Sequence, residues 1–230
     1  MKKILIIVHN VDRRVGSLGP LLVSEGHDVR TCYLDGGEPL PDLGEVDAIA
    51  SMGAAHSIYD DTASVREECT FIERAMTRDI PVFGICYGAH LLAHVLDARV
   101  FKGPHLEVGY FPLSATREGS GLFPEKFWAY QWHNDTFELP SSTTLLATGE
   151  TYYNQAFSAN DRTFGVQFHP EILGPVLASW MRDYEHLLVG PHAQPAPLQL
   201  AMHEQHHGVM HTWMKTFVKD RWLSRASTRS

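Results

Sequence analysis

The first hundred residues alternate between short apolar runs and segments with helical spacing, and this alternation is the feature that most constrains the fold. The predicted strands cover residues 3–9, 27–34, 46–52 and 81–85, and the first of them has the apolar run typical of a buried strand. Segments with helical potential follow at about 14–25, 62–78 and 87–96. Because parallel strands need crossover connections, this order predicts a doubly wound α/β fold with a mostly parallel sheet and helices on both of its faces.

The chain beyond residue 100 has a different texture and is expected to be β-rich. Short alternating runs at 107–113, 126–132, 143–147, 155–159 and 163–168 indicate mostly antiparallel strands. A core helix over about 173–188 follows, and Gly190-Pro191 then marks a linker before a helix at 198–223. We therefore predict one folded domain over residues 1–190, followed by a linker and a C-terminal helical extension over 191–230.

Composition and charge exclude several classes of protein. Of the 230 residues, 44% are hydrophobic and 20% are charged, which is ordinary for a globular protein and excludes a disordered or fibrous chain. The net charge of −8 opposes general binding to nucleic acid or to an anionic membrane. No apolar stretch approaches the roughly 20 residues of a membrane span, and the three cysteines lack disulfide or metal-ligand spacing. We therefore expect a cytoplasmic protein with no nucleic-acid or membrane partner.

The fourth predicted strand ends at Gly84-Ile85-Cys86-Tyr87-Gly88, a pattern typical of a nucleophile elbow. Glycines two residues before and after the centre permit a sharp strand-to-helix turn, because a side chain at either place would collide with the reversing chain. Cys86 then lies at a helix N-terminus, where the helix dipole favours the reactive thiolate. Taken alone, the five residues fit a buried structural cysteine equally well. Because the carboxyl ends of parallel strands meet in one crevice, we expect Gly53 to lie near Cys86.

A base for this cysteine is available in the segment Gln167-Phe168-His169-Pro170-Glu171. His169 follows a predicted strand, and Glu171 lies two residues further on, so both side chains can point to the same side of an extended segment. The proline between them favours an extended backbone at His169. The pattern predicts a triad in which the imidazole of His169 lies between the thiol of Cys86 and the carboxylate of Glu171.

Taken together, four ordered segments resemble the class I, triad-type glutamine amidotransferases, in particular the stand-alone proteins similar to the glutaminase domain of GMP synthetase. The resemblance covers about residues 1–190. The four segments are Met52-Gly53-Ala54-Ala55-His56-Ser57-Ile58-Tyr59-Asp60, Gly84-Ile85-Cys86-Tyr87-Gly88-Ala89-His90-Leu91-Leu92-Ala93, Trp132-His133-Asn134-Asp135 and Gly165-Val166-Gln167-Phe168-His169-Pro170-Glu171. The resemblance implies a flavodoxin-like version of the doubly wound fold.

The resemblance also implies a role for each matching residue. Cys86 would attack the carboxamide of glutamine, His169 would protonate the departing ammonia and then activate water, and Glu171 would hold the useful tautomer of His169. Backbone N–H groups of Tyr87 and of the Gly53-Ala54 turn would bind the oxyanion. The residues expected to contact the substrate are His90, His133, Asp135 and Gln155.

Three residues depart from the usual pattern of that family. Ala55 stands where a proline is common. Ala54 stands where a second glycine is common, and an alanine adopts unusual backbone angles less readily than a glycine. His90 stands where many glutamine-using members carry glutamine. A histidine is shorter and can be charged, so it changes how the crevice contacts a ligand.

Three functions therefore stay open. The first is a glutaminase-type amidotransferase that releases ammonia from glutamine through a cysteinyl thioester. Because no synthase domain or ATP-binding signature follows in the sequence, we expect the ammonia to pass to a separate synthase partner or to solution. The second is a γ-glutamyl hydrolase or peptidase that acts on another γ-glutamyl amide or peptide, which His90 favours. The third is an inactive binding or regulatory protein, which the intact Cys86, His169 and Glu171 disfavour. No cofactor is expected.

One motif near the C-terminus predicts a different chemistry. His203-Glu204-Gln205-His206-His207 matches H-E-x-x-H, in which two histidines one helical turn apart bind zinc. The motif lies beyond the expected domain, and the glycine and histidine that follow it do not have the spacing of metzincins, so we predict no functional metal site. A weak adventitious site at His203, His207 and His211 is the alternative. We expect an amphipathic helix that packs on the domain or on a second copy of the chain in a homo-oligomer. Its apolar residues are Leu200, Val209, Trp213 and Phe217.

Overall fold

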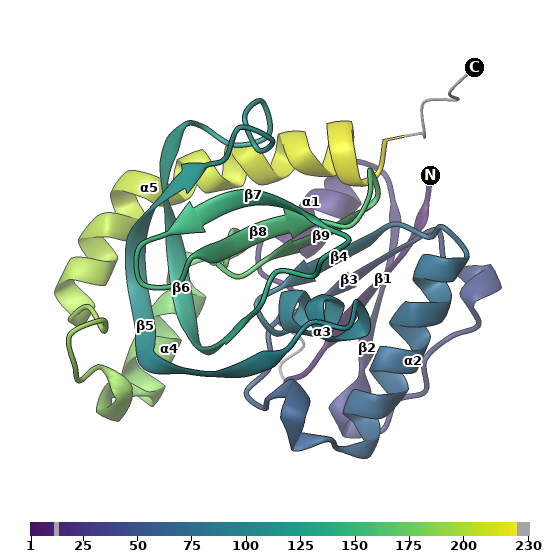
Figure 1. Cartoon of the computed structure of the whole chain (residues 1–230), viewed down its shortest axis with the longest axis horizontal. Helices are drawn as coiled ribbons and strands as arrows, with labels where there is room; N and C mark the ends of the chain where they lie inside the picture. The colour runs from purple at the N-terminus through teal and green to yellow at the C-terminus, as the bar shows by residue number, and fades with distance from the viewer. Residues whose placement is uncertain (12–13, 225–230) are drawn as a thin grey trace.

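The structure is a computed structural model and describes residues 1–11 and 14–224. Within those residues, nine strands form one mixed sheet (Figure 1). In spatial order across the sheet they are β2 (Asp28–Tyr33), β1 (Lys3–Val8), β3 (Ala48–Ser51), β4 (Val82–Ile85), β9 (Thr163–Val166), β8 (Asn154–Ser158), β7 (Thr144–Gly149), β5 (Val100–Ala115) and β6 (Lys126–Phe137). The pairing is parallel from β2 to β9 and antiparallel from β9 to β6. This architecture confirms the expected α/β fold class with its β-rich second half.

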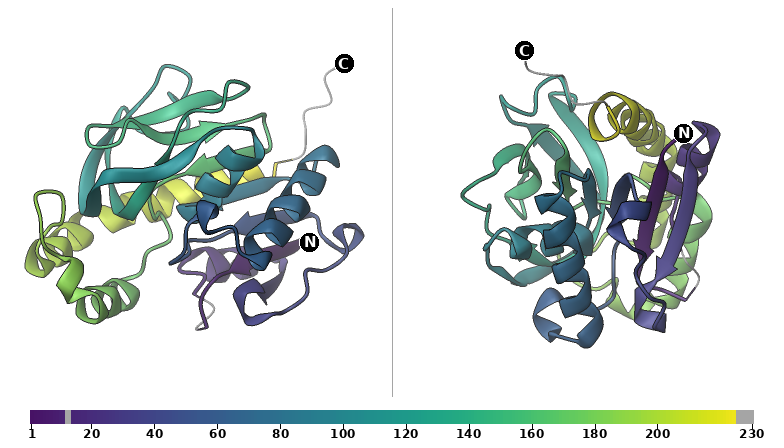
Figure 2. Two further views of the ribbon diagram at one scale, coloured as in Figure 1. Left: turned by 60° about the horizontal axis from the view of Figure 1, so that its bottom comes forward. Right: turned by 90° about the vertical axis from the view of Figure 1, so that its right-hand side faces the viewer.

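Helices cover both faces of the parallel half of the sheet (Figure 2). They are α1 (Leu18–Ser24) and α5 (Ala196–Phe217) on one face, and α2 (Ala63–Thr77) and α3 (Tyr87–Val95) on the other. Alternation along β1 explains the division, because Ile4 and Ile6 join the cluster with α1 and α5, whereas Leu5 and Ile7 join the cluster with α2 and α3. All four side chains are at most 1% exposed, as strands covered on both faces require.

A third, smaller cluster lies where the antiparallel strands meet α4 (Gly174–Asp183). Tyr110 of β5 and Tyr130 of β6 are buried there against Leu177 and Met181 of α4. The short 3-10 turn η4 (Glu185–Leu187) follows α4 directly. Together α4 and η4 border the end of the sheet that carries the carboxyl end of β9 (Figure 1).

The C-terminal helix α5 shares the core of the sheet. Trp213 and Phe217 are at most 7% exposed and belong to the same cluster as β1 and α1, whereas Leu200 and Val209 are exposed. The predicted linker is also held in place, because the N–H of Val108 donates to the carbonyl of His192 at 2.9 Å.

The domain boundary at residue 190 and the homo-oligomer through α5 stay predictions. Residues 225–230 of the predicted extension lie outside the described residues. None of the helices that the structure describes combines the length and the apolar character needed to cross a membrane.

Candidate active site

Cys86 is the residue that joins β4 to α3, and its backbone conformation is strained. Its φ of 54° and ψ of −108° lie in a region that non-glycine residues seldom occupy and that is common at functional sites. The flanking glycines make this turn possible. A Cβ on Gly84 would lie 2.3 Å from the carbonyl oxygen of Gly88, and a Cβ on Gly88 would lie 2.1 Å from the carbonyl oxygen of Ser51. Both positions therefore require glycine, as the elbow pattern predicts.

His169 and Glu171 lie on the loop after β9, beside this elbow. Nδ1 of His169 is 2.8 Å from Oε1 of Glu171, and the two residues and Cys86 are each at most 6% exposed. The ring of His169 and the thiol of Cys86 both lie beside Gly53, because a Cβ added to Gly53 would lie 3.1 Å from the His169 Cε1 and 3.9 Å from the Cys86 Sγ. The structure thus brings together the three residues that the sequence predicts as a triad.

The charge on His169 is set by its two neighbours. Burial disfavours the imidazolium, but the carboxylate of Glu171, then the negative charge of Cys86 and hydrogen bonds to both residues outweigh burial and raise the pKa of His169 to about 10. At neutral pH both ring nitrogens therefore carry a proton. One of them faces Glu171 and the other faces Cys86.

The loop before α1 holds the backbone of Glu171, and no motif in the sequence predicts this contact. The N–H of Ser17 donates to the carbonyl oxygen of Glu171 at 2.9 Å, and the Ser17 hydroxyl lies 3.2 Å from the same oxygen. Gly16 has a φ of +53°, and a Cβ there would lie 2.3 Å from that carbonyl oxygen. The only sequence signal is Gly16 itself, which interrupts a segment with helical potential.

The segment after β3 lies against the other side of the predicted triad. Gly53 and Ala54 line the same cavity as Cys86 and Tyr87. Neither Gly53 nor Ala54 has a positive φ, so the alanine carries none of the backbone strain for which a glycine would be needed. These positions are compatible with the oxyanion site expected from the resemblance, whose role stays a prediction.

A buried ion pair that the motifs did not predict lies behind the Gly53 turn. Glu68 of α2 is 0% exposed, accepts a hydrogen bond from the Ser51 hydroxyl at 2.7 Å, and pairs with Nε2 of His9 at 2.8 Å. Burial disfavours a charged His9, but the charge of Glu68 outweighs burial and raises the pKa of His9. The pair ties the ends of β1 and β3 to α2. The signal in the sequence was that Glu68 stands three residues after Val65, on the apolar face of its helix.

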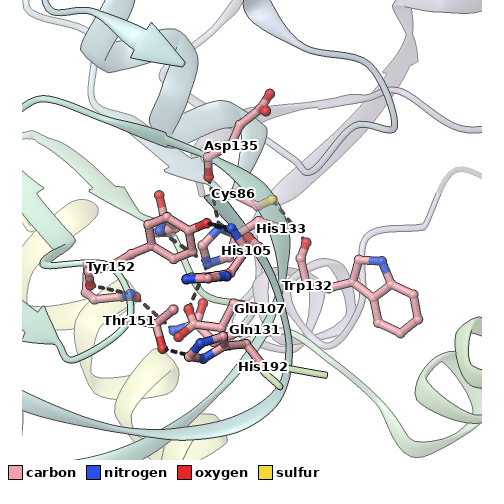
Figure 3. A network of polar contacts seen from close by, with 12 residues as sticks. Cys86, His105, Glu107, Gln131, Trp132, His133, Asp135, Thr151, Tyr152 and His192 are labelled. Carbon is pink, nitrogen blue, oxygen red and sulfur yellow. Dashed lines mark hydrogen bonds and ion pairs between the residues drawn. The ribbon is translucent and has the colours of Figure 1, made fainter. Parts of the chain in front are cut away.

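A chain of buried polar side chains borders Cys86 on the side of the antiparallel strands. His90 Nε2 lies 3.2 Å from Gln167 Oε1, and Gln167 Nε2 lies 3.2 Å from His133 Nε2. His133 Nε2 also lies 3.0 Å from Glu107 Oε2 (Figure 3). Burial and then the neighbouring His133 lower the pKa of His90 to about 4, so His90 is neutral at neutral pH. Neither Glu107 nor Gln167 is predicted as a site residue from the sequence, although Gln167 stands in the segment that carries His169.

Asp135 and Gln155, both predicted to contact substrate, occupy different places. Asp135 lines the cavity and accepts hydrogen bonds from the hydroxyls of Ser57 and Tyr59, the latter at 2.7 Å. Gln155 is 0% exposed, does not line the cavity, and accepts a hydrogen bond from Gln131 Nε2 at 2.8 Å. Its position in the core contradicts the expectation of direct contact with substrate.

One cavity of about 360 Å³ connects these parts, a volume within the range of small-molecule sites. The predicted site residues on its wall are Cys86, His169, Glu171, Gly53, Ala54, Tyr87, His90, His133 and Asp135. Nine of the ten residues predicted to form the site therefore share this one cavity.

The histidines of the H-E-x-x-H motif make protein contacts on α5. His203 Nδ1 lies 2.7 Å from the hydroxyl of Tyr110, and His207 Nδ1 lies 2.6 Å from the carbonyl oxygen of His203. Across residues 1–11 and 14–224, no group of three or more His, Cys, Asp or Glu side chains is placed to hold a metal ion.

The sequence profile of the family described as "Glutamine amidotransferase class-I" matches residues 47–179, more than half of the chain. The chain belongs to the class-I glutamine amidotransferase family. The matched region contains the elbow, the loop with His169 and Glu171, and the polar chain from His90 to Glu107. The family membership implied by the four sequence segments is thereby confirmed.

Individual relatives agree with this assignment. The chain is 27% identical over 184 residues to the glutamine amidotransferase-like protein YfeJ of Salmonella typhimurium, a match that covers 74% of this chain and 75% of that protein. It is 32% identical over 150 residues to the glutamine-hydrolyzing GMP synthase subunit of Thermoplasma volcanium, covering 64% of this chain and 68% of that protein. The crystal structure of a glutamine amidotransferase from Thermotoga maritima matches with a TM-score of 0.87 and 25% identity, covering 97% of this chain and 99% of the other.

Several other relatives are named glutamine-hydrolyzing GMP synthases, and the match to this chain covers only about 24% of their length.

Proposed function

We propose that this amidotransferase hydrolyses the γ-carboxamide of glutamine through a thioester on Cys86 and releases ammonia. The observation that carries the proposal is the meeting of a strained cysteine, a histidine and a carboxylate that contacts the histidine in one small-molecule cavity. A cysteine paired with a histidine that a third group orients is the arrangement of nucleophilic catalysis. A cationic imidazole beside a cysteine favours the thiolate, which is the reactive form.

The first half of the reaction forms the thioester. The sulfur of Cys86 attacks the γ-carbonyl carbon, and the carbonyl electrons move to oxygen. Backbone N–H groups of Tyr87 and of the Gly53-Ala54 turn stabilise the resulting oxyanion; one such donor contributes about 3–4 kcal/mol in hydrolases. The carbon–nitrogen bond then breaks, and His169 gives its proton to the departing nitrogen.

The second half releases glutamate. The neutral His169 takes a proton from water, the hydroxide attacks the thioester carbon, and the carbon–sulfur bond breaks. Glu171 keeps the protonated Nδ1 of His169 directed toward itself through their 2.8 Å contact, so that Nε2 stays available to the reacting atoms.

The ammonia acceptor is proposed to be a separate synthase. The support is the likeness to a protein that is named as one subunit of a glutamine-hydrolyzing GMP synthase. A reduced Cys86 is needed throughout, which fits a cytoplasmic location.

A second candidate function is hydrolysis of a γ-glutamyl compound whose nitrogen carries a substituent. The observation that favours it is the extent of the cavity, which continues past His169 along Val176, Trp180 and Leu187. The same mechanism would serve, with an amine instead of ammonia as the leaving group.

The test is release of glutamate by the purified protein, with Cys86→Ala as the variant and Cys69→Ala as a matched control. Cys69 is a free, half-buried thiol on α2 that does not line the cavity. We expect glutamate from glutamine with wild type and Cys69→Ala, and at least a hundredfold slower release with Cys86→Ala. Release that survives Cys86→Ala would contradict the mechanism. Release from γ-glutamyl amides but not from glutamine would favour the second candidate.

A further inference from the structure

The cavity around Cys86 has two chemically different halves, and β6 divides them. Successive residues of this strand point to opposite sides, so His133 joins the polar network with Glu107 while the indole of Trp132 points away from it (Figure 3). The carbonyl of Trp132, on the strand between them, lies 3.9 Å from the Cys86 Sγ. The reacting sulfur therefore lies at the boundary between a polar half and an aromatic half.

Aromatic rings build the second half. Trp132 contacts Trp180 of α4 edge-on with 5.4 Å between ring centroids, and it contacts Tyr184 at 5.9 Å. Leu173, Val176 and Leu187 line the same part of the cavity. None of these six side chains is charged, and Tyr184 and Leu173 are 43% and 38% exposed, so part of the apolar lining is uncovered.

His169 connects this aromatic half to the chemistry. Its ring meets Trp180 edge-to-face with 5.3 Å between centroids, while its Nδ1 faces Glu171. The nitrogen that leaves during thioester formation must lie within hydrogen-bond reach of His169, since His169 protonates it. A substituent on that nitrogen therefore begins beside His169 and Trp180.

The polar half suits the glutamyl part of the substrate. Hydrogen-bonding groups that line it include the side chains of His90, His133 and Asp135. The two groups joined by a scissile amide lie on opposite sides of its carbonyl carbon. If the glutamyl part occupies the polar half, the substituent on the leaving nitrogen extends into the aromatic half.

We propose that the surface formed by Trp132, Val176, Trp180, Tyr184 and Leu187 is a leaving-group subsite that binds an uncharged, apolar or aromatic substituent on the γ-nitrogen. This inference rests on the proposed γ-carboxamide hydrolysis and names the class of substrate for which the cavity is built. The reaction consumes a γ-glutamyl amide and water, breaks the carbon–nitrogen bond, and yields glutamate and an apolar primary amine protonated by His169. Glutamine, which carries no substituent, leaves this subsite empty.

The test compares four substrates that differ only on the nitrogen: glutamine and the γ-glutamyl amides of methylamine, benzylamine and butane-1,4-diamine. We expect kcat/KM for the benzylamide to exceed that for the methylamide at least tenfold, as even one methylene in an apolar pocket can give a tenfold or larger preference. Equal values for benzylamide and methylamide, or the highest value for the charged diamine, would overturn the subsite.

Single substitutions test whether the preference for the benzylamide arises from the aromatic residues of the proposed subsite. Tyr184→Ala removes an exposed ring that contacts Trp132, and it should lower the benzylamide-to-methylamide ratio several-fold. Trp180→Leu should lower the benzylamide-to-methylamide ratio further. Because Trp180 also contacts His169, this variant can change the turnover of every substrate. Trp128→Leu is the matched control, because Trp128 lies on the same strand but stacks on His206 outside the cavity and should leave the ratio unchanged.

The outcomes separate the two proposals. If all four compounds are cleaved only when Cys86 is present, the hydrolase function stands whatever the order of the substrates. If under those conditions kcat/KM is equal for the benzylamide and the methylamide, or is highest for the charged diamine, only the proposal of the leaving-group subsite is contradicted. If Cys86→Ala cleaves them as fast as wild type, the proposed function fails.

Discussion

Nδ1 of His169 lies 2.8 Å from Oε1 of Glu171, and this contact determines which ring nitrogen is directed toward Cys86. Glu171→Gln keeps the size of the side chain but removes the charge that supports the imidazolium. We expect kcat for glutamate release to fall by at least about a hundredfold with little change in KM, because the ring loses its orienting partner rather than a substrate contact. Steady-state kinetics measure the effects on kcat and KM separately. Glu185→Gln, on the exposed surface of η4, is the control and should leave both constants unchanged. A rise in KM alone would show that Glu171 contacts the substrate instead.

His90 is buried in its neutral form, and stability should therefore depend on pH through it. Because its pKa falls from about 6.5 to about 4 on folding, the unfolded chain binds a proton that the folded chain does not between these values. His90 should remove about 1–2 kcal/mol of stability as pH falls from 7 to 5. Urea unfolding of wild type and His90→Gln at both pH values measures the difference. The variant should lose less stability on acidification; an equal loss in both proteins would contradict a buried neutral His90.

Replacing a glycine with alanine should destabilise the protein where the added Cβ would clash and stabilise it where the space is open. Gly88 and Gly208 test the two cases. Gly88→Ala places a Cβ 2.1 Å from the Ser51 carbonyl oxygen and should cost about 3 kcal/mol or more. Gly208→Ala, on α5 with no atom within 4 Å of the added Cβ, should instead stabilise the protein by about 0.5–1 kcal/mol. Chemical denaturation gives both values. Tolerance of alanine at position 88 would refute the tight elbow.

The buried Glu68 should contribute to stability through His9 and Ser51. Glu68→Gln leaves His9 without its counter-charge and should cost about 2–3 kcal/mol, whereas Glu67→Gln on the exposed face of the same helix should change stability by less than about 0.5 kcal/mol. The pKa of His9 is raised on folding, so the stabilisation is complete below about pH 6.5 and is lost as pH rises through the folded value. The cost of Glu68→Gln should therefore shrink in alkaline buffer. A cost that is constant with pH would mean that the charge of His9 is not involved.

The elbow and the His169 loop could be predicted because each depends on neighbours in sequence. The spacing of Gly84 and Gly88 about Cys86 reflects a local backbone turn, and the spacing of His169 and Glu171 reflects one extended segment. Strands β1, β3 and β4 were predicted for a similar reason, since their apolar runs are buried whatever their order in the sheet, whereas the edge strand β2 buries only Cys32.

The contacts that were missed depend on which strands become neighbours. Glu107 reaches His133 because β5 pairs with β6 in a register that sets these two residues opposite each other. Gln155 was assigned to the substrate although its face of β8 points into the core, where Gln131 bonds to it. Neither register nor face follows from the residues of one strand alone.

The central claim is that Cys86 forms the covalent bond to the γ-carbonyl group, and a γ-diazoketone analogue of glutamine tests it most directly. The measurement is the intact mass of the protein after incubation with the analogue, followed by peptide mapping. We predict one adduct per chain on Cys86, protection by excess glutamine, no label on Cys32 or Cys69, and no adduct in Cys86→Ala. Glutamate release from glutamine by a protein that takes up no label, or that carries the label on another residue, would contradict the account.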